Sequence, residues 1–272
     1  MKILNELEYA KEIVGNKPNY KKKIKFRLIA KYFYHVKNLR GQDLEKELNE
    51  FCTKYVTYFN KVTWFKTVES WCRYVTKNSL FIVKPVKITM KEYECIKSVN
   101  SKDYEKVLFI LLILTKINKQ KYMLYVEDKL KYTDTEKEFT CEDYYVVETI
   151  NEILKLAHVK LGSTRKKYDL MTKIMDLGLI DVNKNGKLKI EFVDEECEED
   201  YVMIDDFDND ESWVLEYTSR EYGEKVKNCE SCGKLIKAKG KNNKYCKECF
   251  DKRRKEQINK NSKKYYNDNI KK

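Results

Sequence analysis

Hydrophobic residues recur every three or four positions over much of the first eighty residues, and this is the period of an amphipathic helix. The pattern predicts four helices, over about residues 4–14, 21–38, 42–52 and 64–76. The repeated positions, such as Ile29 and Phe33 in the second helix, are interpreted as core contacts. Asp43 is expected to cap the third helix, because its carboxylate can accept hydrogen bonds from free N–H groups at a helix start.

The pattern changes after residue 80 and then returns to helical spacing. Residues 81–88 are rich in β-branched side chains and contain Pro85, which indicates an edge strand or an extended connector. A short helix is expected over about residues 91–99. A strongly apolar helix, capped by Ser101 and covering about residues 104–117, is expected to be the most buried element.

The clearest local pattern lies between residues 149 and 193. Thr149 and Glu152 have the spacing of a capping box, which predicts the start of a helix. A second helix is expected to begin near Ser163, to bury Leu177 in its last turn and to end at Gly178. Two short β-branched runs then flank a four-residue turn, which is a hairpin signal: Asn183-Lys184-Asn185-Gly186.

This order of helix, turn, helix and hairpin resembles a winged helix-turn-helix domain, as does the Leu-Gly-Leu-Ile joint at residues 177–180. The resemblance implies that the second helix is a recognition helix and the hairpin a wing. It implies nucleic-acid contacts from the polar and basic residues of these two elements: Lys160, Thr164, Arg165, Lys166, Lys167, Lys184, Lys187 and Lys189. The alternative is a packing or protein-docking module whose lysines form a solvated face.

Charge is segregated along the chain. The net charge is +12, yet residues 1–193 carry +13, residues 222–272 carry +11, and residues 194–219 hold twelve acidic and no basic side chains. The distribution predicts two basic bodies separated by an acidic segment. That segment is either a linker or a strand and short helix that pack against the body, and its carboxylates are interpreted mainly as a solvated loop.

Four of the nine cysteines have the spacing of metal ligands. Cys229 and Cys232 form one pair, Cys246 and Cys249 form the other, and Gly233 supplies the turn after the first pair. Two such pairs complete a tetrahedral S₄ site, which predicts one structural zinc ion with no open position for catalysis. Because so short a segment cannot build a core, we expect metal binding worth ~10–16 kcal/mol to fold it. The alternative is a set of redox dithiols or unrelated thiols.

The chain after the last cysteine is basic. The order of two cysteine pairs followed by a basic helix resembles the treble-clef or ribbon zinc modules of bacterial and phage nucleic-acid proteins. The resemblance implies that Cys246 and Cys249 begin a helix that contacts phosphates through a run of four cations: Lys252, Arg253, Arg254 and Lys255. Tyr265 and Tyr266 are then candidates for stacking on unpaired bases, and the alternative is a solubilising tail.

The remaining cysteines and both histidines are interpreted as structural. The scattered thiols are expected to be buried or partly buried: Cys52, Cys72, Cys95, Cys141 and Cys197. His35 lies among aromatic residues and His158 at a helix end. The chain holds no Gly-rich phosphate loop, no Ser elbow and no His-Glu-x-x-His motif, so we expect no enzymatic activity.

The sequence predicts a soluble protein with no membrane partner and no small-molecule substrate. No signal peptide opens the chain, and its longest apolar run, residues 107–114, is far shorter than a bilayer span. More broadly, the chain resembles a family of phage and prophage proteins of low-GC Gram-positive bacteria that join a helical body to a C-terminal Cys₄ finger. The resemblance brings no established activity and implies a location in the cytoplasm of a bacterial host cell.

We therefore predict a mainly α (α+β) fold with four regions: a helical N-terminal body (1–100), a winged-helix-like segment (101–193), an acidic connector (194–221) and a small Cys₄ zinc module with a basic tail (222–272). The predicted function is non-enzymatic nucleic-acid binding in transcription, replication or recombination, with DNA favoured over RNA. One alternative is a protein-binding inhibitor or adaptor of host nucleic-acid machinery, such as an anti-defence protein. Another is a metal-dependent nuclease that uses a cluster of acidic residues: Asp205, Asp206, Asp208 and Asp210.

Overall fold

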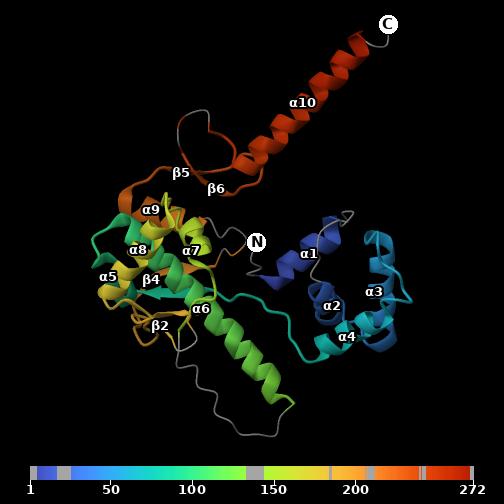
Figure 1. Cartoon of the computed structure of the whole chain (residues 1–272), viewed down its shortest axis with the longest axis horizontal. Coiled ribbons are helices and arrows are strands. Elements are labelled where there is room, and N and C mark those ends of the chain that lie inside the picture. The colour runs from blue at the N-terminus through green and yellow to red at the C-terminus, as the bar shows by residue number, and fades with distance from the viewer. Residues whose placement is uncertain are drawn as a thin grey trace. The chain divides into compact units, whose positions relative to one another are not determined.

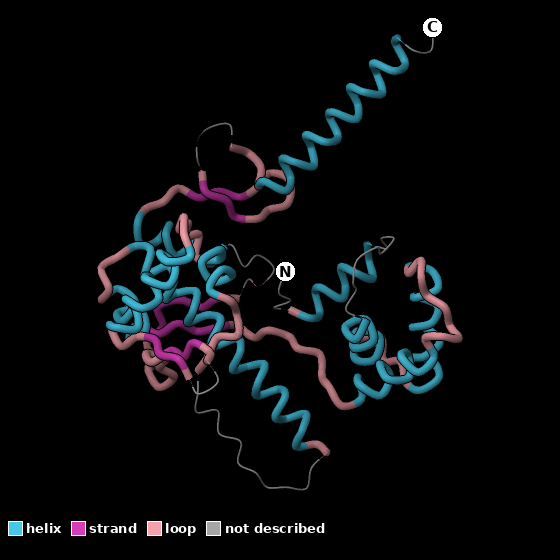
Figure 2. The backbone as a smooth tube through the Cα atoms, in the orientation of Figure 1, coloured by secondary structure: helices cyan, strands magenta, loops and turns pink. Residues whose placement is uncertain are grey.

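A computed structural model of the chain describes most of its residues: 5–16, 26–132, 144–183, 186–205, 207, 212–238, 240 and 243–269. The described residues form helices and three short two-stranded antiparallel sheets (Figures 1 and 2), which confirms the predicted mainly α fold. Internal contacts divide the chain into two compact units. Unit 1 takes residues 1–95, 111–147 and 172–208, and unit 2 takes residues 96–110, 148–171 and 209–272. Each unit therefore draws on several of the regions that composition predicts.

Four helices form the first part of unit 1: α1 (Glu6–Asn16), α2 (Phe26–His35), α3 (Gly41–Tyr55) and α4 (Phe65–Thr76). Their apolar faces meet in a common core that includes Ile29, Phe33, Leu44 and Val68. This confirms the expected core stripes of α2 and α3. Asp43 lies in the first turn of α3, but no side chain caps this helix, so the predicted cap is wrong.

A two-stranded sheet lies elsewhere in unit 1. Strand β1 (Val86–Thr89) pairs antiparallel with β4 (Asp200–Ile204), and Val86 lies opposite Ile204. The short helix α5 (Met90–Lys97) follows β1 directly. Residues 200–204 of the acidic segment thus form a strand that is joined to the body by main-chain hydrogen bonds. This agrees with the packed alternative rather than with a free linker.

Helix α6 (Lys102–Leu130) is the longest helix among the described residues and contributes to both units. Its residues 107–114 are at most 2% exposed, so the expectation of a deeply buried helix is confirmed. The helix does not end near residue 117 as expected but continues to Leu130, and Val126 and Asp128 are still buried in this extension. Where the structure describes the chain, no helix combines the length and apolar character needed to cross a bilayer.

Two helices and a hairpin follow: α7 (Ile150–Leu156), α8 (Thr164–Asp176), β2 (Ile180–Val182) and β3 (Leu188–Ile190). Both capping-box hydrogen bonds between Thr149 and Glu152 are present, and the Ser163 hydroxyl accepts a hydrogen bond from the N–H of Lys166 at 3.3 Å. Gly178 has φ +72°, as expected for the residue that ends a helix. The prediction that Leu177 is buried is wrong: α8 ends one residue earlier and Leu177 is 55% exposed.

A third extended segment joins this hairpin. Tyr145 forms a β-bridge with Lys189. The N–H of Val146 donates to the carbonyl of Leu188 at 2.8 Å, and the N–H of Ile190 donates to the carbonyl of Tyr144 at 2.9 Å. The segment just before α7 therefore pairs with β3, the second strand of the hairpin.

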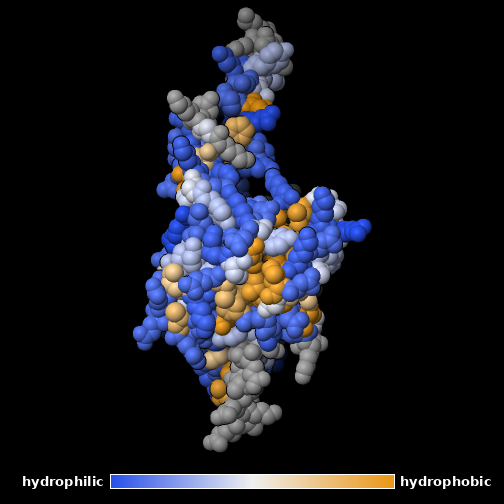
Figure 3. All heavy atoms as spheres, turned by 90° about the vertical axis from the view of Figure 1, so that its left-hand side faces the viewer, coloured by the Kyte–Doolittle hydropathy of each residue, from blue (hydrophilic) through white to orange (hydrophobic). Residues whose placement is uncertain are grey.

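Unit 2 ends with α9 (Ser212–Tyr222), the hairpin of β5 (Val226–Asn228) and β6 (Leu235–Lys237), and α10 (Lys247–Asn269). Trp213 and Tyr217 of α9 are at most 2% exposed, and the Tyr217 ring stacks on Phe109 with centroids 4.6 Å apart. The hydroxyl of Tyr217 also donates to the buried carboxylate of Glu105 at 2.9 Å. Helix α9 is therefore a core element of unit 2, and it is where the acidic segment ends. Hydrophilic residues cover most of the face drawn in Figure 3, and hydrophobic residues gather near its middle.

Candidate metal centre and nucleic-acid interface

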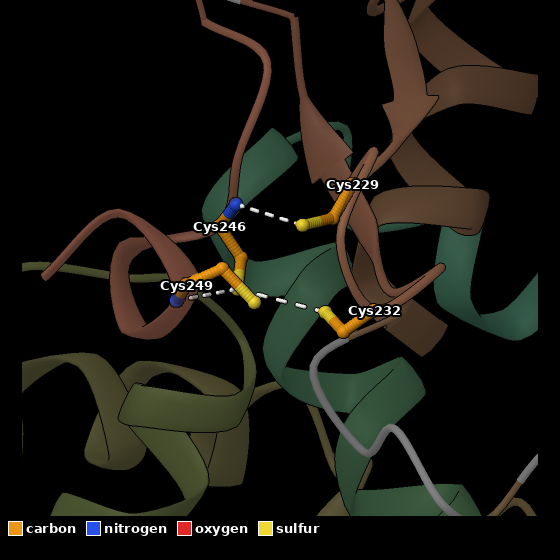
Figure 4. A group of neighbouring side chains, drawn as sticks. All are labelled: Cys229, Cys232, Cys246 and Cys249. Atoms are coloured by element: carbon orange, nitrogen blue, oxygen red, sulfur yellow. Dashed lines mark hydrogen bonds between the residues drawn. The ribbon is translucent and has the colours of Figure 1, made fainter. Parts of the chain in front are cut away.

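The first pair of cysteines lies in a tight turn between β5 and β6. The N–H of Cys229 donates to the carbonyl of Lys234 at 2.8 Å, and the N–H of Gly233 donates to the carbonyl of Cys229 at 2.9 Å. Gly233 has φ +74°, which a residue with a side chain rarely adopts. These bonds close a knuckle that turns the Cys229 and Cys232 side chains toward the same point (Figure 4).

The second pair lies at the start of α10. Cys246 directly precedes the helix and Cys249 is in its first turn, where the N–H of Phe250 donates to the carbonyl of Cys246 at 2.9 Å. The four Sγ atoms all lie within 4.8 Å of one another, and those of Cys232 and Cys246 are 3.7 Å apart. Four Zn–S bonds of ~2.3 Å in a tetrahedron place sulfur atoms about 3.8 Å apart. The cysteines therefore form the metal-binding arrangement that their spacing predicts.

The electrostatics of the cluster favour a bound cation. Burial opposes ionisation of Cys229, but N–H donors, including that of Cys246 at 3.3 Å, outweigh it and lower its pKa to about 6. The N–H of Lys234 favours ionisation of Cys232, but burial and the neighbouring thiols raise its pKa to about 12. One thiolate therefore forms readily and a second is disfavoured. A metal ion would supply the positive charge that allows all four thiols to ionise.

The hairpin of this module is tied to the rest of unit 2 by an ion-pair network. Glu224, just after α9, contacts Lys102 at 2.6 Å and Lys237 of β6 at 2.9 Å. Hydrogen bonds from these two ammonium groups, first Lys102 and then Lys237, lower the pKa of Glu224 to about 2. The network fixes β6 at a defined place beside the first turn of α6.

The predicted cations of α10 are exposed, but one of them, Arg253, is bound by a neighbouring tyrosine. Lys252, Arg254 and Lys255 point to solvent. Arg253 donates to the hydroxyl of Tyr245 at 2.7 Å, and its guanidinium lies 4.1 Å from the centre of that ring. Tyr245 was not predicted to contact these cations. Its position directly before Cys246 was the only sequence feature that could have indicated this contact. Tyr265 and Tyr266 are 66% and 52% exposed.

The predicted contacts at the start of α8 are exposed as well. Lys160, Thr164, Arg165 and Lys166 are all open to solvent. Lys167 is half-buried and donates to Oδ1 of Asn151 at 2.8 Å. The first turn of α8 contains no acidic side chain. All of these residues belong to unit 2 and lie within eight consecutive positions of the chain.

The predicted lysines of the hairpin differ from those of α8, because both described members have partners. Lys187 lies 4.3 Å from the centre of the Tyr145 ring, and Lys189 pairs with Glu191 at 3.2 Å. Lys184 lies outside the described residues. The hairpin belongs to unit 1, so the structure does not place these lysines with those at the start of α8.

The described residues of the acidic segment do not form a carboxylate metal site. Asp205 is exposed, and Asp206, Asp208 and Asp210 lie outside the described residues. Three acidic side chains that precede Asp205 pair with lysines of unit 1: Asp194 with Lys91, Glu195 with Lys119 and Asp200 with Lys87. Among the described residues, the Cys₄ cluster is the one group of three or more metal-ligating side chains that lie close together.

The scattered cysteines that the structure describes are buried or partly buried. Cys52 is buried, and Cys72, Cys95 and Cys197 are partly buried, as predicted, whereas Cys141 lies outside the described residues. Burial raises the pKa of Cys52 to about 12 and that of Cys72 to about 11. Neither thiol is activated for nucleophilic chemistry.

Comparison of the chain with protein-family models, with curated proteins and with solved structures finds no match.

Proposed function

We propose that this chain is a non-enzymatic nucleic-acid-binding protein, stabilised by one structural zinc ion, with DNA favoured over RNA. The observation that carries the proposal is the charge at the start of α8, where Arg165, Lys166 and Lys167 occupy the first turn without an acidic residue. The positive end of a helix dipole favours acidic side chains there. A cationic first turn costs stability, and it also makes a surface to which phosphate groups are attracted.

The order of elements around α8 supports a winged-helix interpretation. A strand segment at residues 144–146 precedes α7, α8 and the β2–β3 hairpin, and this segment pairs with β3. In a winged helix, a strand before the helix pair joins the wing hairpin in this way, and the second helix enters the major groove. On this interpretation α8 is the recognition helix, and the first residues of α8 face the nucleic acid.

The Cys₄ module supports the same proposal. One pair of cysteines lies in a knuckle and the other at the start of a helix, which is the arrangement of a treble clef rather than of a ribbon with two knuckles. Four thiolate ligands leave no coordination position for water or substrate, so the zinc would be structural. The exposed cations of α10 follow directly and would add phosphate contacts. The proposed role is that of a phage-type accessory protein in transcription, replication or recombination.

The adaptor alternative has less support. It relies on the acidic segment as a surface for a cationic partner. Asp200 and Glu195 instead pair with Lys87 and Lys119 within unit 1. These carboxylates neutralise the body of the protein, which leaves fewer of them for a partner.

Fluorescence anisotropy with labelled duplex DNA, single-stranded DNA and duplex RNA of one sequence tests the proposal. We expect the logarithm of the binding constant to fall linearly with the logarithm of the salt concentration, with a slope of about −0.9 for each duplex phosphate contact. Binding to none of the three at low salt would overturn the proposal. A pull-down from nuclease-treated bacterial lysate separates the adaptor role, because only a protein partner would survive that treatment.

A further inference from the structure

Two hollows of unit 2 share the residues His158 and Lys160. The first, about 610 Å³, lies along α7 and the turn that leads to α8, and Asn151 and Lys167 are also part of its lining. The second, about 560 Å³, lies between α9, the first turns of α6 and the Cys₄ hairpin. Because His158 and Lys160 line both hollows, the two lie next to each other, and together they are named here the junction groove. It runs from the helix pair to the metal module.

The lining of the junction groove is strongly cationic. It contains a single acidic residue, Glu224, and six basic ones: Lys106, Lys155, Lys160, Lys167, Lys237 and Lys247. Glu224 is already bound by Lys102 and Lys237, and its low pKa of about 2 keeps it ionised within that network. No other acidic residue belongs to the lining, so the groove carries a net positive charge that attracts an anion.

Lys106 lines the second hollow as one member of an ion pair. Its side chain is only 11% exposed, and its ion-pair partner Asp103, at 2.6 Å, is 53% exposed on the same helix. Because Asp103 already compensates the charge of Lys106, the attraction of the groove for an anion comes mainly from Lys160 and Lys247 and from the other lysines of the lining that have no acidic neighbour there. Tyr245 and Asn243 line the groove near its end and add polar groups.

We infer that the junction groove binds the phosphate backbone of one nucleic-acid strand and carries it from the α7–α8 turn to the Cys₄ hairpin. The inference rests on the proposed function and goes further. It assigns contacts with phosphate groups to Lys106, Lys155, Lys237 and Lys247, and none of these lysines was predicted from the sequence to bind nucleic acid. It also gives the zinc module a direct part in binding, since β6 and residues 243–247 form one wall of the groove.

The test uses the full-length zinc-loaded protein and the substitutions Lys160→Gln, Lys247→Gln and both together. Lys173→Gln, in the last turn of α8 and outside the groove, is the matched control. Each groove variant should bind about 3- to 10-fold more weakly, without change of sequence preference, and the salt slope should fall by about 1 for each lysine lost. The control should match the wild type, and circular dichroism and zinc content should be unchanged in all variants.

The outcomes separate the two proposals. If the wild type binds with a steep salt slope and the double variant binds equally well, the groove inference is wrong and the proposed function stands. If the wild type binds no nucleic acid, both are wrong. Acetylation footprinting gives a second measure: bound nucleic acid should protect Lys155, Lys160 and Lys247, but not Lys173. Equal modification with and without nucleic acid would also overturn the inference.

Discussion

Glu92, which has no exposed surface, forms an ion pair at 2.7 Å with Lys116 in unit 1. The same carboxylate accepts hydrogen bonds from the N–H groups of Thr89 and Asp194, both at 2.9 Å. The Lys116 ammonium also donates to the carbonyl of Lys87 at 2.7 Å. A single buried pair therefore joins β1, the start of α5, the middle of α6 and the first residue of the acidic segment.

The substitution Lys116→Met should lower the free energy of unfolding of unit 1 by about 3–5 kcal/mol, because it leaves the Glu92 carboxylate buried without its cation. Adding Glu92→Gln should recover part of the loss, since the amide carries no charge. Urea unfolding at pH 7 measures both, and Lys129→Met, at an exposed site of the same helix, should shift stability by about 0.5 kcal/mol or less. A Lys116→Met protein as stable as the wild type would show that the pair is not buried.

Asp128, on the last turns of α6, gives unit 1 a dependence on pH. Its carboxylate accepts hydrogen bonds from the N–H of Ser79 at 2.6 Å and from Lys131 at 3.0 Å. Burial opposes ionisation of Asp128, but the hydrogen bonds from Ser79 and Lys131 outweigh it and lower the pKa. A folded-state pKa below the unfolded value stabilises the protein above the unfolded pKa of about 3.9, and the stabilisation is lost as the pH falls through the folded pKa.

Asp128→Asn should therefore lower the stability of unit 1 by about 1–3 kcal/mol at pH 7. The difference from the wild type should shrink as the pH falls below about 4. Denaturant unfolding across pH measures this, and exposed Asp43→Asn is the control that should show a much smaller effect. A difference between wild type and Asp128→Asn that stays constant from neutral to acid pH would contradict the assignment.

The Cys₄ cluster predicts one bound metal ion on which the small module depends. Strong chelation, or Cys232→Ser, should unfold residues 229–250 and leave the helices of unit 1 intact, because the module has no core of its own. Hydrogen exchange should show lost protection in residues 229–250, which include β6 and the first turn of α10, and cobalt substitution should give the absorption of a thiolate-bound tetrahedral ion. Cys197→Ser, outside the cluster, should change neither. A module that stays protected without metal would contradict a structural metal site.

Local signals in the sequence were sufficient for part of this fold. The Thr149–Glu152 capping box, the glycine after α8 and the cysteine spacing each act over a few residues, so their consequences could be predicted without a tertiary structure. Thr89 and Glu92 have the same capping-box spacing as Thr149 and Glu152, and their reciprocal hydrogen bonds start α5. That signal was missed because it lies at the end of a strand pattern.

Contacts between distant residues could not be predicted. Lys116 lies 24 positions from Glu92, and Asp200 lies more than a hundred positions from Lys87. Charge counts show the acidic segment and the basic body but not which carboxylate meets which lysine. The junction groove has the same origin, because its lysines come from α6, α7, α8, the turn between α7 and α8, β6 and the start of α10 and are brought together only by folding.

The first turn of α8 should show opposite effects on stability and on binding. Arg165→Gln with Lys166→Gln removes two cations from the positive end of the helix dipole, so the free energy of unfolding should rise by roughly 0.3–1 kcal/mol. Affinity for nucleic acid should fall by about tenfold or more, because two phosphate contacts are lost. Lys173→Gln, at the other end of α8, should lower stability by a few tenths of a kcal/mol, about the value of a cation at a helix C-terminus, and leave affinity unchanged. Thermal unfolding and anisotropy on the same samples measure both quantities. A double variant that gains stability and keeps its affinity would show that the cationic turn is only a solvated surface.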